Sequence, residues 1–130
     1  MAASSRDAGK VVDRWDDVFR AVASEPRRQL IVALLDESPD DTVALPASAA
    51  NPRLPDDPDS LRALLYHHHL PLLADLEFVA WDVDPLVASR GPRFEEVAVV
   101  FEALHDWAAD VPDSLALGCQ RLEAERRADP

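Results

Sequence analysis

The sequence contains one cysteine and three glycines in 130 residues, and both shortages limit what the chain can do. Cys119 alone can form neither an intrachain disulfide nor a cysteine metal site, so we expect an inert thiol in a reducing compartment. So few glycines provide no glycine-rich loop to hold a phosphate. No apolar run approaches the roughly 18 residues that span a bilayer, and residues 1–7 lack the apolar stretch of a signal peptide. We therefore expect a cytoplasmic protein without membrane contact.

Lysine is almost absent, because Lys10 is the only one and the other cationic side chains are arginines. The sequence has 13 basic and 25 acidic residues, which gives a net charge of −12. This excludes a protein that binds nucleic acid through an overall basic surface. Any contact with nucleic acid must therefore be local. With 48% hydrophobic residues, the composition predicts one folded domain with a modest core. A lysine-poor, carboxylate-rich surface is similar to that of proteins from halophiles that accumulate salt.

Apolar residues recur mostly at helical spacing, which predicts a mainly α-helical chain. Residues 1–12 are small, polar and aperiodic, and we interpret them as a disordered N-terminal tail. The expected helices cover residues 13–24, 24–36, 59–76, 92–109 and 113–126, with one short helical turn at 46–50 in an otherwise extended connection. Residues 78–89 alternate around Asp84-Pro85 and predict a small β-hairpin.

Two helices carry more detailed predictions. Ser24 precedes Glu25-Pro26 and is expected to cap the second helix, whose exposed entry holds Arg27 and Arg28. In the helix at 59–76, Pro71 removes a backbone hydrogen bond and predicts a kink or a change of turn type. The apolar stripe expected along this helix comprises Leu61, Leu64, Leu65, His68, Leu72 and Leu76.

This order of elements is that of a winged helix-turn-helix, and two segments add a family resemblance. Val18–Ile31 contains Ser24-Glu25-Pro26-Arg27 between two apolar helices and resembles the opening of ArsR-type regulators. His68–Val79 is similar to the end of their recognition helix and the turn into the wing. The closest resemblance is to haloarchaeal winged-helix domain proteins that are predicted transcription regulators. The winged-helix domain would then cover residues 13–109, followed by a C-terminal helix and tail at 110–130.

The resemblance implies a regulator that binds double-stranded DNA as a homodimer, without a cofactor. The residues expected at the bases are Arg62, Tyr66 and His67, and those expected at the phosphates are Arg27, Arg28, Arg90 and Arg93. The residues expected at the dimer interface are Trp15, Phe101, Leu104 and Trp107, which could equally fill the core of one chain. Glu77 stands where the family commonly has glycine, so the turn into the wing is made without the most permissive residue.

Other functions find less support in the sequence. Ala63, Leu64 and Leu65 occupy positions where the family offers polar groups to bases, and the stretch from Arg53 to Asp75 carries four aspartates against two arginines. The alternative is therefore a protein-interaction module that has lost DNA binding and docks a partner on the leucines at 61, 64 and 65.

We expect no metal site at His67–His69, because the side chains of three consecutive helical residues point about 100° apart. No nucleophile is paired with a base, so we expect no enzyme.

Overall fold

The computed structural model describes residues 5–54, 57–116 and 122–125, and the chain divides into two compact units, 1–97 and 98–130. The described part is mainly helical with a small antiparallel sheet. The first unit contains α1 (Ser5–Ala21), α2 (Glu25–Asp36), β1 (Val43–Ala44), η1 (Ala47–Ala49), α3 (Pro58–Leu64), η2 (Leu65–His69), α4 (Leu70–Asp75), β2 (Val79–Val83) and β3 (Leu86–Arg90). Helix α5 (Phe94–Asp106) crosses the division, and the second unit adds η3 (Ala108–Asp110) and α6 (Asp113–Ala116).

Helix α1 begins earlier than the sequence predicted. Residues 5–12 are helical, so the expectation of a disordered tail up to residue 12 is wrong for them. The reason is that Asp7 lies in the first turn, where a carboxylate suits the helix dipole, and Val11 and Val12 continue the apolar spacing of Trp15 and Phe19. Only Gly9 in this stretch disfavours a helix.

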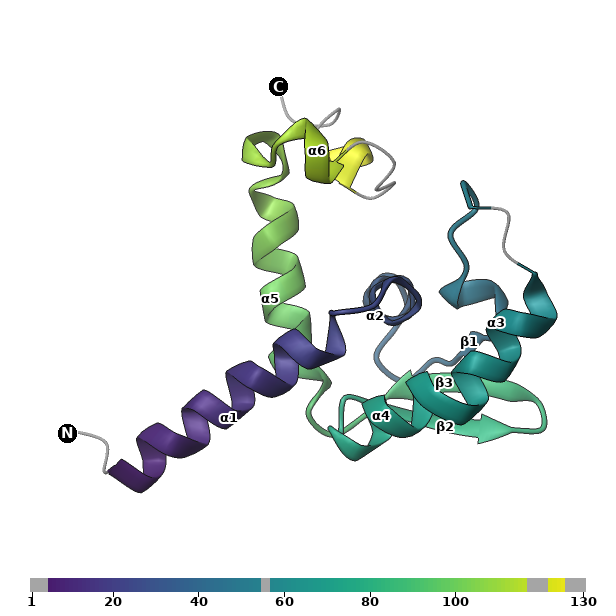
Figure 1. The fold of residues 1–130 in the computed structure, drawn as a ribbon, viewed down its shortest axis with the longest axis horizontal. Coiled ribbons are helices and arrows are strands. Elements are labelled where there is room, and N and C mark those ends of the chain that lie inside the picture. Colours follow the sequence, from purple (N-terminus) through teal and green to yellow (C-terminus); the bar gives the residue numbers. More distant parts are fainter. Residues whose placement is uncertain (1–4, 55–56, 117–121, 126–130) are drawn as a thin grey trace. The chain divides into compact units, whose positions relative to one another are not determined.

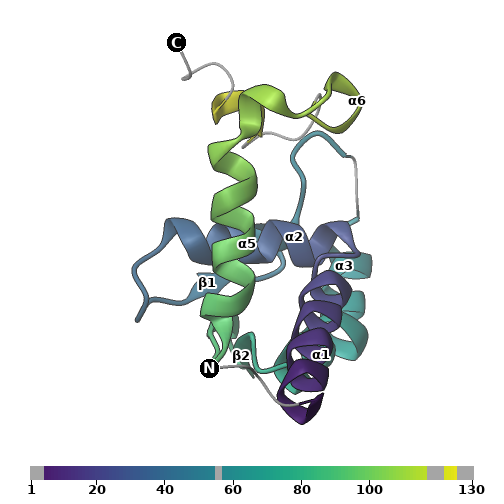
Figure 2. The ribbon, with the colours of Figure 1, turned by 90° about the vertical axis from the view of Figure 1, so that its left-hand side faces the viewer.

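Helix α2 follows the prediction closely. Ser24 precedes it in an extended conformation (φ −135°, ψ 140°), and Pro26 lies in its first turn, although the Ser24 side chain makes no capping bond. Leu30, Ile31 and Leu34 are fully buried and form the centre of the first unit. Figure 1 shows α2 end-on and Figure 2 shows it from the side, so its axis runs across the direction of the hairpin.

The predicted hairpin at 78–89 is confirmed, and a third strand joins it. Strands β2 and β3 pair in an antiparallel register that places Trp81 opposite Ala88 and Val83 opposite Leu86. The two-residue strand β1 pairs with the other edge of β3, which gives the order β1-β3-β2. A strand of two residues is too short to produce an alternating sequence pattern, so the sequence could not reveal it. One side of the sheet carries the buried Val79 and Leu86.

The helix expected at 59–76 changes its turn type just before Pro71, as predicted. It consists of α3, one π-helical turn in η2, and α4. The Leu70 N–H donates to the carbonyl of Leu65, five residues back, so the chain is wider there than in an α-helix.

This π turn changes which residues of the long helix face the core. The buried side chains are Leu61, Leu65, His69, Leu70, Leu73 and Leu76. Leu64 and His68, which the predicted stripe placed inside, are exposed. The prediction assumed a uniform α-helical period, and the extra residue in the π turn shifts the positions from this turn onward, His68 among them, around the axis. Leu64 lies before the turn, so the shift does not account for its exposure.

The turn between α4 and β2 uses a left-handed residue that is not glycine. Glu77 has φ 65°, its N–H donates to Ala74, and the Phe78 N–H donates to Leu73. These two bonds form a Schellman cap at the end of α4. Gly91 packs against the same turn, since a Cβ at that position would lie 2.6 Å from the Glu77 carbonyl oxygen.

The second unit has a small apolar cluster of its own. Ala108, Ala116 and Leu122 are buried together, with Val111 packed against them. Before this cluster, His105 Nδ1 donates to the Phe101 carbonyl (2.7 Å), and the two rings stack with centroids 5.8 Å apart. The thiol of Cys119 and the arginines at 121, 126 and 127 lie outside the described residues. Among the described helices, none combines the length and the apolar character that crossing a membrane requires.

Candidate functional site

The seven residues expected to contact DNA all lie in the first unit, but the structure separates them into two groups. Arg27 and Arg28 are in the first turn of α2, Arg62 is in α3, Tyr66 and His67 are in η2, Arg90 ends β3, and Arg93 precedes α5. The four arginines expected at phosphates bind groups of the chain itself. The three residues expected at bases are exposed on the outer side of the long helix.

Arg27 is buried, so the expectation of an exposed position at the start of α2 is wrong for this residue. Its Nε donates to the carbonyl of Ala21 (2.9 Å) and its Nη2 to the carbonyl of Arg20 (3.0 Å), both in the last turn of α1. Its Nη1 donates to Nδ1 of His69 (2.9 Å). The guanidinium group therefore joins the end of α1 to the π turn and has no free side for a phosphate.

The electrostatics of this buried pair favour a neutral histidine. Burial, the charge of Arg27 and the neighbouring His68 lower the pKa of His69 to about 4, so its Nδ1 accepts a hydrogen bond at neutral pH. Burial also lowers the pKa of Arg27, followed by the charge of Arg28, although an arginine remains protonated. Of the three consecutive histidines, only His69 packs in the core, whereas His67 and His68 are exposed.

Arg28 and Arg90 also bind carbonyl groups at helix ends. Arg28 is exposed, and its Nη1 donates to the carbonyl of Val22 (2.7 Å) after α1. Arg90 Nη2 donates to the carbonyls of Leu34 (3.0 Å) and Glu37 (3.1 Å) at the end of α2, and its guanidinium carbon lies 4.9 Å from the centre of the Phe94 ring. The last carbonyls of a helix lack intrahelical partners, and a cation there also suits the helix dipole.

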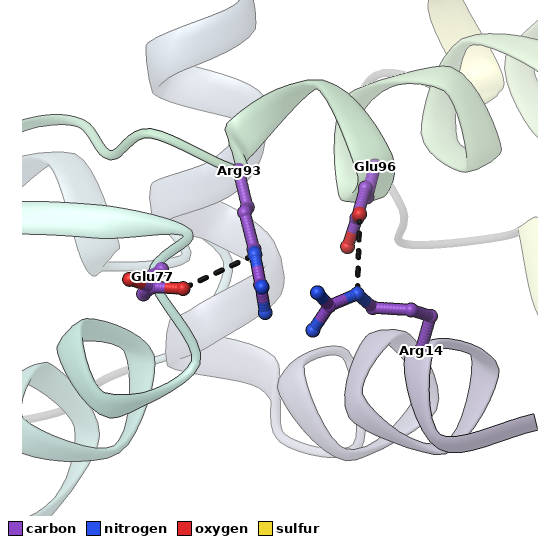
Figure 3. Close-up of polar contacts among 4 residues, drawn as sticks. All are labelled: Arg14, Glu77, Arg93 and Glu96. Carbon is purple, nitrogen blue, oxygen red and sulfur yellow. Dashed lines mark ion pairs between the residues drawn. The ribbon is translucent and has the colours of Figure 1, made fainter. Parts of the chain in front are cut away.

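Arg93 belongs to a charge cluster near the turn at Glu77. Its Nε lies 3.1 Å from a carboxylate oxygen of Glu77, and Nε of Arg14 lies 3.5 Å from Glu96. Figure 3 shows the guanidinium groups of Arg93 and Arg14 beside each other, with Glu77 on the far side of Arg93 and Glu96 above Arg14. The cluster contains as many carboxylates as guanidinium groups, so it offers no net positive charge to a phosphate.

The exposed residues of the second group lie beside the hairpin. The Tyr66 ring meets the Trp81 ring edge to face, with centroids 5.7 Å apart, and meets the His67 ring in the same manner at 4.8 Å. Arg62 is four residues before Tyr66 and therefore on the same side of the helix. Val83 is two residues after Trp81 and therefore on the same side of β2. We call Arg62, Tyr66, His67, Trp81 and Val83 the helix–hairpin face.

The helix–hairpin face combines exposed apolar surface with few cations. Tyr66 is 43% exposed and Val83 is 47% exposed, while Trp81 is half-buried. The side chain of Arg62 is exposed and makes no polar contact within the described part of the chain. Asp59, three residues before Arg62 on the helix, and Asp84, next to Val83, are both exposed, so the local charge is slightly negative.

The leucine stripe expected for a partner does not form a surface. Leu61 and Leu65 are 6% and 0% exposed, so only Leu64 among the three is accessible. Trp81 and Val83 were the residues that sequence analysis missed, because hairpin residues of alternating character were assigned to the fold alone. The sequence contained one signal for these residues, which was an aromatic residue in a predicted strand of a hairpin that is rich in aspartate.

The four residues expected at a dimer interface differ in exposure. Trp15 is 50% exposed, Leu104 46% and Trp107 68%, whereas Phe101 is 6% exposed and stacks on His105. Phe101 therefore offers little surface to another chain.

Neither a metal site nor a known relative guides the assignment of function. Among the residues that the structure describes, no three His, Cys, Asp or Glu side chains gather in a way that could hold a metal ion. Comparisons of this chain with models of protein families, with curated proteins and with solved structures found no match.

Proposed function

We propose that the first unit is a winged helix. The support is its order of elements, in which α2, η1 and the long helix α3-η2-α4 precede a hairpin whose strand β3 also pairs with β1. In such folds the helix before the hairpin is the recognition helix and the hairpin is the wing. Because a fold hosts several functions, the function has to be argued from the exposed residues.

We propose that the chain acts as a protein-interaction module of transcription regulation, without catalysis, and that the helix–hairpin face is its docking surface. The observation that carries this proposal is the contact between the rings of Tyr66 and Trp81, beside the exposed Arg62 on the same side of the helix. Arginine, tyrosine and tryptophan are the residue types most enriched at the energetic centres of protein interfaces. Val83 adds an exposed aliphatic contact next to them.

The charges at the border of this face indicate the chemistry of the partner. Asp59 and Asp84 are exposed, and a chain with a net charge of −12 attracts cationic surfaces. The partner that fits is a protein segment with an apolar or aromatic anchor flanked by basic residues. The anchor would pack on Tyr66, Trp81 and Val83, and the basic residues would lie over the two aspartates.

DNA binding is the second candidate, favoured by the exposure of Arg62, Tyr66 and His67 on the proposed recognition helix. In this case Arg62 would contact base edges, and a homodimer would place one such helix in each of two successive major grooves. The arginines that were expected at the phosphates argue against DNA binding. Arg27 and Arg90 donate to backbone carbonyls, and Arg93 pairs with Glu77, so these cations are already bound within the chain. Without phosphate contacts, a protein loses the main source of DNA affinity.

Site-specific photocrosslinking in cells that make the protein separates the two candidates. A photoreactive amino acid is placed at Val83, within the face, or at Glu95, an exposed control position on α5. The adducts formed at position 83 are then digested with nuclease or with protease. We expect a discrete adduct that only protease removes and that Tyr66→Ala abolishes, since the Tyr66 ring is part of the docking surface.

Each other outcome has a defined meaning. An adduct that nuclease removes and Arg62→Ala abolishes would establish DNA binding in place of the interaction module. Equal adducts at positions 83 and 95 would reject a specific surface at the helix–hairpin face. Anisotropy titrations with a labelled duplex in dilute and in molar KCl give the same distinction in vitro, and we expect no binding at either salt concentration.

A further inference from the structure

Strand β2 lies at an open border of the sheet. The strand order β1-β3-β2 gives β2 one neighbour, since among the described residues only β3 pairs with it. Figure 1 shows β2 at the lower border of the sheet, with β3 and then β1 above it. Backbone groups at such a border lack partners within the sheet and can pair with a strand of another chain.

A hydrogen bond on the other side of β3 shows which backbone groups of β2 point outward. The Leu45 N–H donates to the Leu86 carbonyl (3.1 Å), so the backbone groups of Leu86 face β1. In an antiparallel pair, opposite residues exchange either two hydrogen bonds or none. Val83 lies opposite Leu86, so this pair exchanges none, and the N–H and C=O of Val83 point to the open side of β2.

A second hydrogen bond, at the base of the hairpin, gives the same result. The Gly91 N–H donates to the Phe78 carbonyl (2.9 Å), so the backbone of Phe78 faces β3. Successive residues of a strand face opposite sides in turn, so Trp81, three residues later, faces the open side together with Val83. Among the described residues, neither backbone has another hydrogen-bond partner. We call Trp81, Asp82 and Val83 the β2 edge.

The side chains of the β2 edge differ between the two sides of the sheet. Trp81 and Val83 point to the side of the long helix, where the Trp81 ring meets the Tyr66 ring. Asp82 points to the opposite side and is exposed, and so is Asp84 in the turn. A strand placed along this edge would therefore meet apolar surface on one side and a carboxylate on the other.

We propose that an extended segment of the partner protein, with apolar and basic residues in alternation, binds along the β2 edge as an additional antiparallel strand. This inference deepens the docking proposed for the helix–hairpin face and rests on it. Apolar residues of the segment would lie opposite Trp81 and Val83 and exchange two backbone hydrogen bonds with each, and a basic residue would lie opposite Asp82. Addition of a strand to an open sheet border is a recurring mode of peptide recognition. Antiparallel pairing is the slightly more stable kind.

Charge favours a basic segment over a second copy of β2. Opposite charges directly across two strands stabilise the pair, and like charges destabilise it. A second copy would bring its own Asp82 and Asp84 to the edge of a chain that already carries a net charge of −12. An arginine or lysine opposite Asp82 forms a cross-strand ion pair instead. The β2 edge therefore disfavours its own copies and suits a strand of opposite charge.

Nuclear magnetic resonance titration of the full chain with a synthetic peptide tests the proposal. The probe is a short peptide that alternates arginine and valine. Its binding should shift the amide proton signals of Trp81 and Val83 downfield and protect both from exchange with solvent, while Ala80 and Asp82, whose backbones face β3, should change less. Because the edge is short, we expect a dissociation constant on the order of 0.1–1 mM.

Methylation of the peptide backbone separates strand addition from contact between side chains alone. In the antiparallel arrangement the valine N–H groups of the peptide point to β2, and the arginine N–H groups point away. Methylating the valine nitrogens should therefore weaken binding on the order of tenfold, since each one removes a hydrogen bond. Methylating the arginine nitrogens should leave the binding nearly unchanged.

Two variants of the protein test the ion pair. Asp82→Lys and Asp40→Lys replace an exposed aspartate by the same cation, but Asp40 lies in the loop after α2 and outside the β2 edge. Asp82→Lys should weaken the peptide on the order of tenfold, because attraction across the strands becomes repulsion. Asp40→Lys should have little effect. Circular dichroism shows whether both variants keep the fold, and equal weakening by both would overturn the specific pair at Asp82.

The two methylated peptides also give the outcomes that would reject the proposal. Equal loss for both, or no loss for either, would overturn strand addition, as would signals of Trp81 and Val83 that do not change at millimolar peptide. Loss confined to the peptide methylated at arginine would overturn the antiparallel direction. Photocrosslinking at Val83 detects any protein bound at the face, however it is held, so the failure of strand addition is distinguishable from the failure of the proposed docking function.

Discussion

Among the individual residues, Arg27 and His69 form the interaction with the most consequences for folding. The Arg27 guanidinium replaces water at two carbonyls of α1 and at the ring of His69, which is 6% exposed. A histidine that accepts this hydrogen bond has to be neutral. Protonation would place two cations in direct contact inside the protein, where charges interact strongly.

This arrangement predicts that the free energy of unfolding falls as the pH decreases from about 7 to about 4. The folded chain holds the pKa of His69 at about 4, against 6.5 ordinarily, chiefly through burial. Between these values the unfolded chain takes up a proton that the folded chain does not, so the stability from neutral His69 is complete above pH 6.5 and is lost progressively toward pH 4. The loss reaches up to about 3 kcal/mol.

Urea unfolding at a series of pH values measures this dependence. The comparison is with His69→Gln, whose amide oxygen can still accept from Arg27 but does not titrate. The variant should lose less stability than the wild type over the same pH interval, since the carboxylates titrate equally in both. Parallel pH profiles for the two proteins would show that His69 does not carry the effect.

The arginines illustrate what residue-level reasoning from sequence can and cannot predict. The sequence places Arg27 and Arg28 in the first turn of α2, and the structure confirms that position. Whether the guanidinium groups then face solvent or the preceding helix depends on where the last carbonyls of α1 lie relative to α2. That position is set by tertiary structure and not by local sequence. The prediction that Arg27 and Arg90 contact phosphates was based only on their positive charge. Carbonyl oxygens at helix ends attract the same cations.

At the scale of elements, the turn between α4 and β2 and the end of β3 depend on each other. Glu77 adopts a left-handed conformation, and its carbonyl accepts from the Arg93 N–H (2.8 Å), while the Gly91 N–H donates to Phe78 (2.9 Å). These bonds bring the two backbone segments so close that Gly91 has no room for a side chain. The sequence points to Glu77 as a departure from the usual glycine, but the need for Gly91 arises only from this contact.

Gly91→Ala should therefore destabilise the protein by about 2–3 kcal/mol, because a Cβ would lie 2.6 Å and 2.7 Å from backbone atoms of Glu77 and Val79. Gly9→Ala is the control. Nothing lies within 4 Å of a Cβ at position 9 in α1, so this change should be neutral or add up to about 1 kcal/mol. Thermal and urea unfolding measure both variants. Equal stability of the two would contradict the close contact at Gly91.

The elements that sequence reasoning predicted are those with a local signal. Ser24 and Pro26 mark the start of α2, and Asp84-Pro85 marks the hairpin turn, so both were located within a few residues. Strand β1 was missed because two residues forming a ladder with β3 have no pattern of their own. Pro71 predicted that the turn type changes, but the stripe on the helix shifted because the width of the π turn was not foreseeable.

For the whole molecule, the net charge of −12 is a large excess of one sign for a chain of 130 residues. Self-repulsion of this kind destabilises the compact state, and added salt screens it. We expect the free energy of unfolding to rise as KCl increases from about 0.1 M to about 1 M, where the Debye length falls from about 10 Å to about 3 Å.

A variant with fewer carboxylates isolates the screening from other effects of salt. Asp40→Asn, Asp82→Asn and Asp84→Asn together remove three exposed charges. The stability of this variant should increase less steeply with KCl than that of the wild type, as measured by urea unfolding. Equal slopes would show that repulsion between surface carboxylates contributes little.

The candidate site was only partly predictable at this scale. The sequence predicted Arg62, Tyr66 and His67 as residues on the accessible side of the long helix, and the structure exposes all three. It could not place Trp81 against Tyr66, because that contact joins a helix and a strand and depends on the register of both. The charge that a surface presents also depends on the fold. The arginines expected at phosphates could have lined a groove, or they could have bound the carbonyls at helix ends.

The π turn adds one residue to the long helix compared with an α-helical turn at the same place. Leu65 and Leu70 both face the core although five positions separate them, which an unbroken α-helix does not allow. A chain shortened by one residue in this turn would close it into an ordinary α-helical turn, in which Leu65 and Leu70 stand four positions apart and still face the core. Both halves of the helix would therefore keep their orientation, so the deletion should leave the packing of α3 and α4 in place.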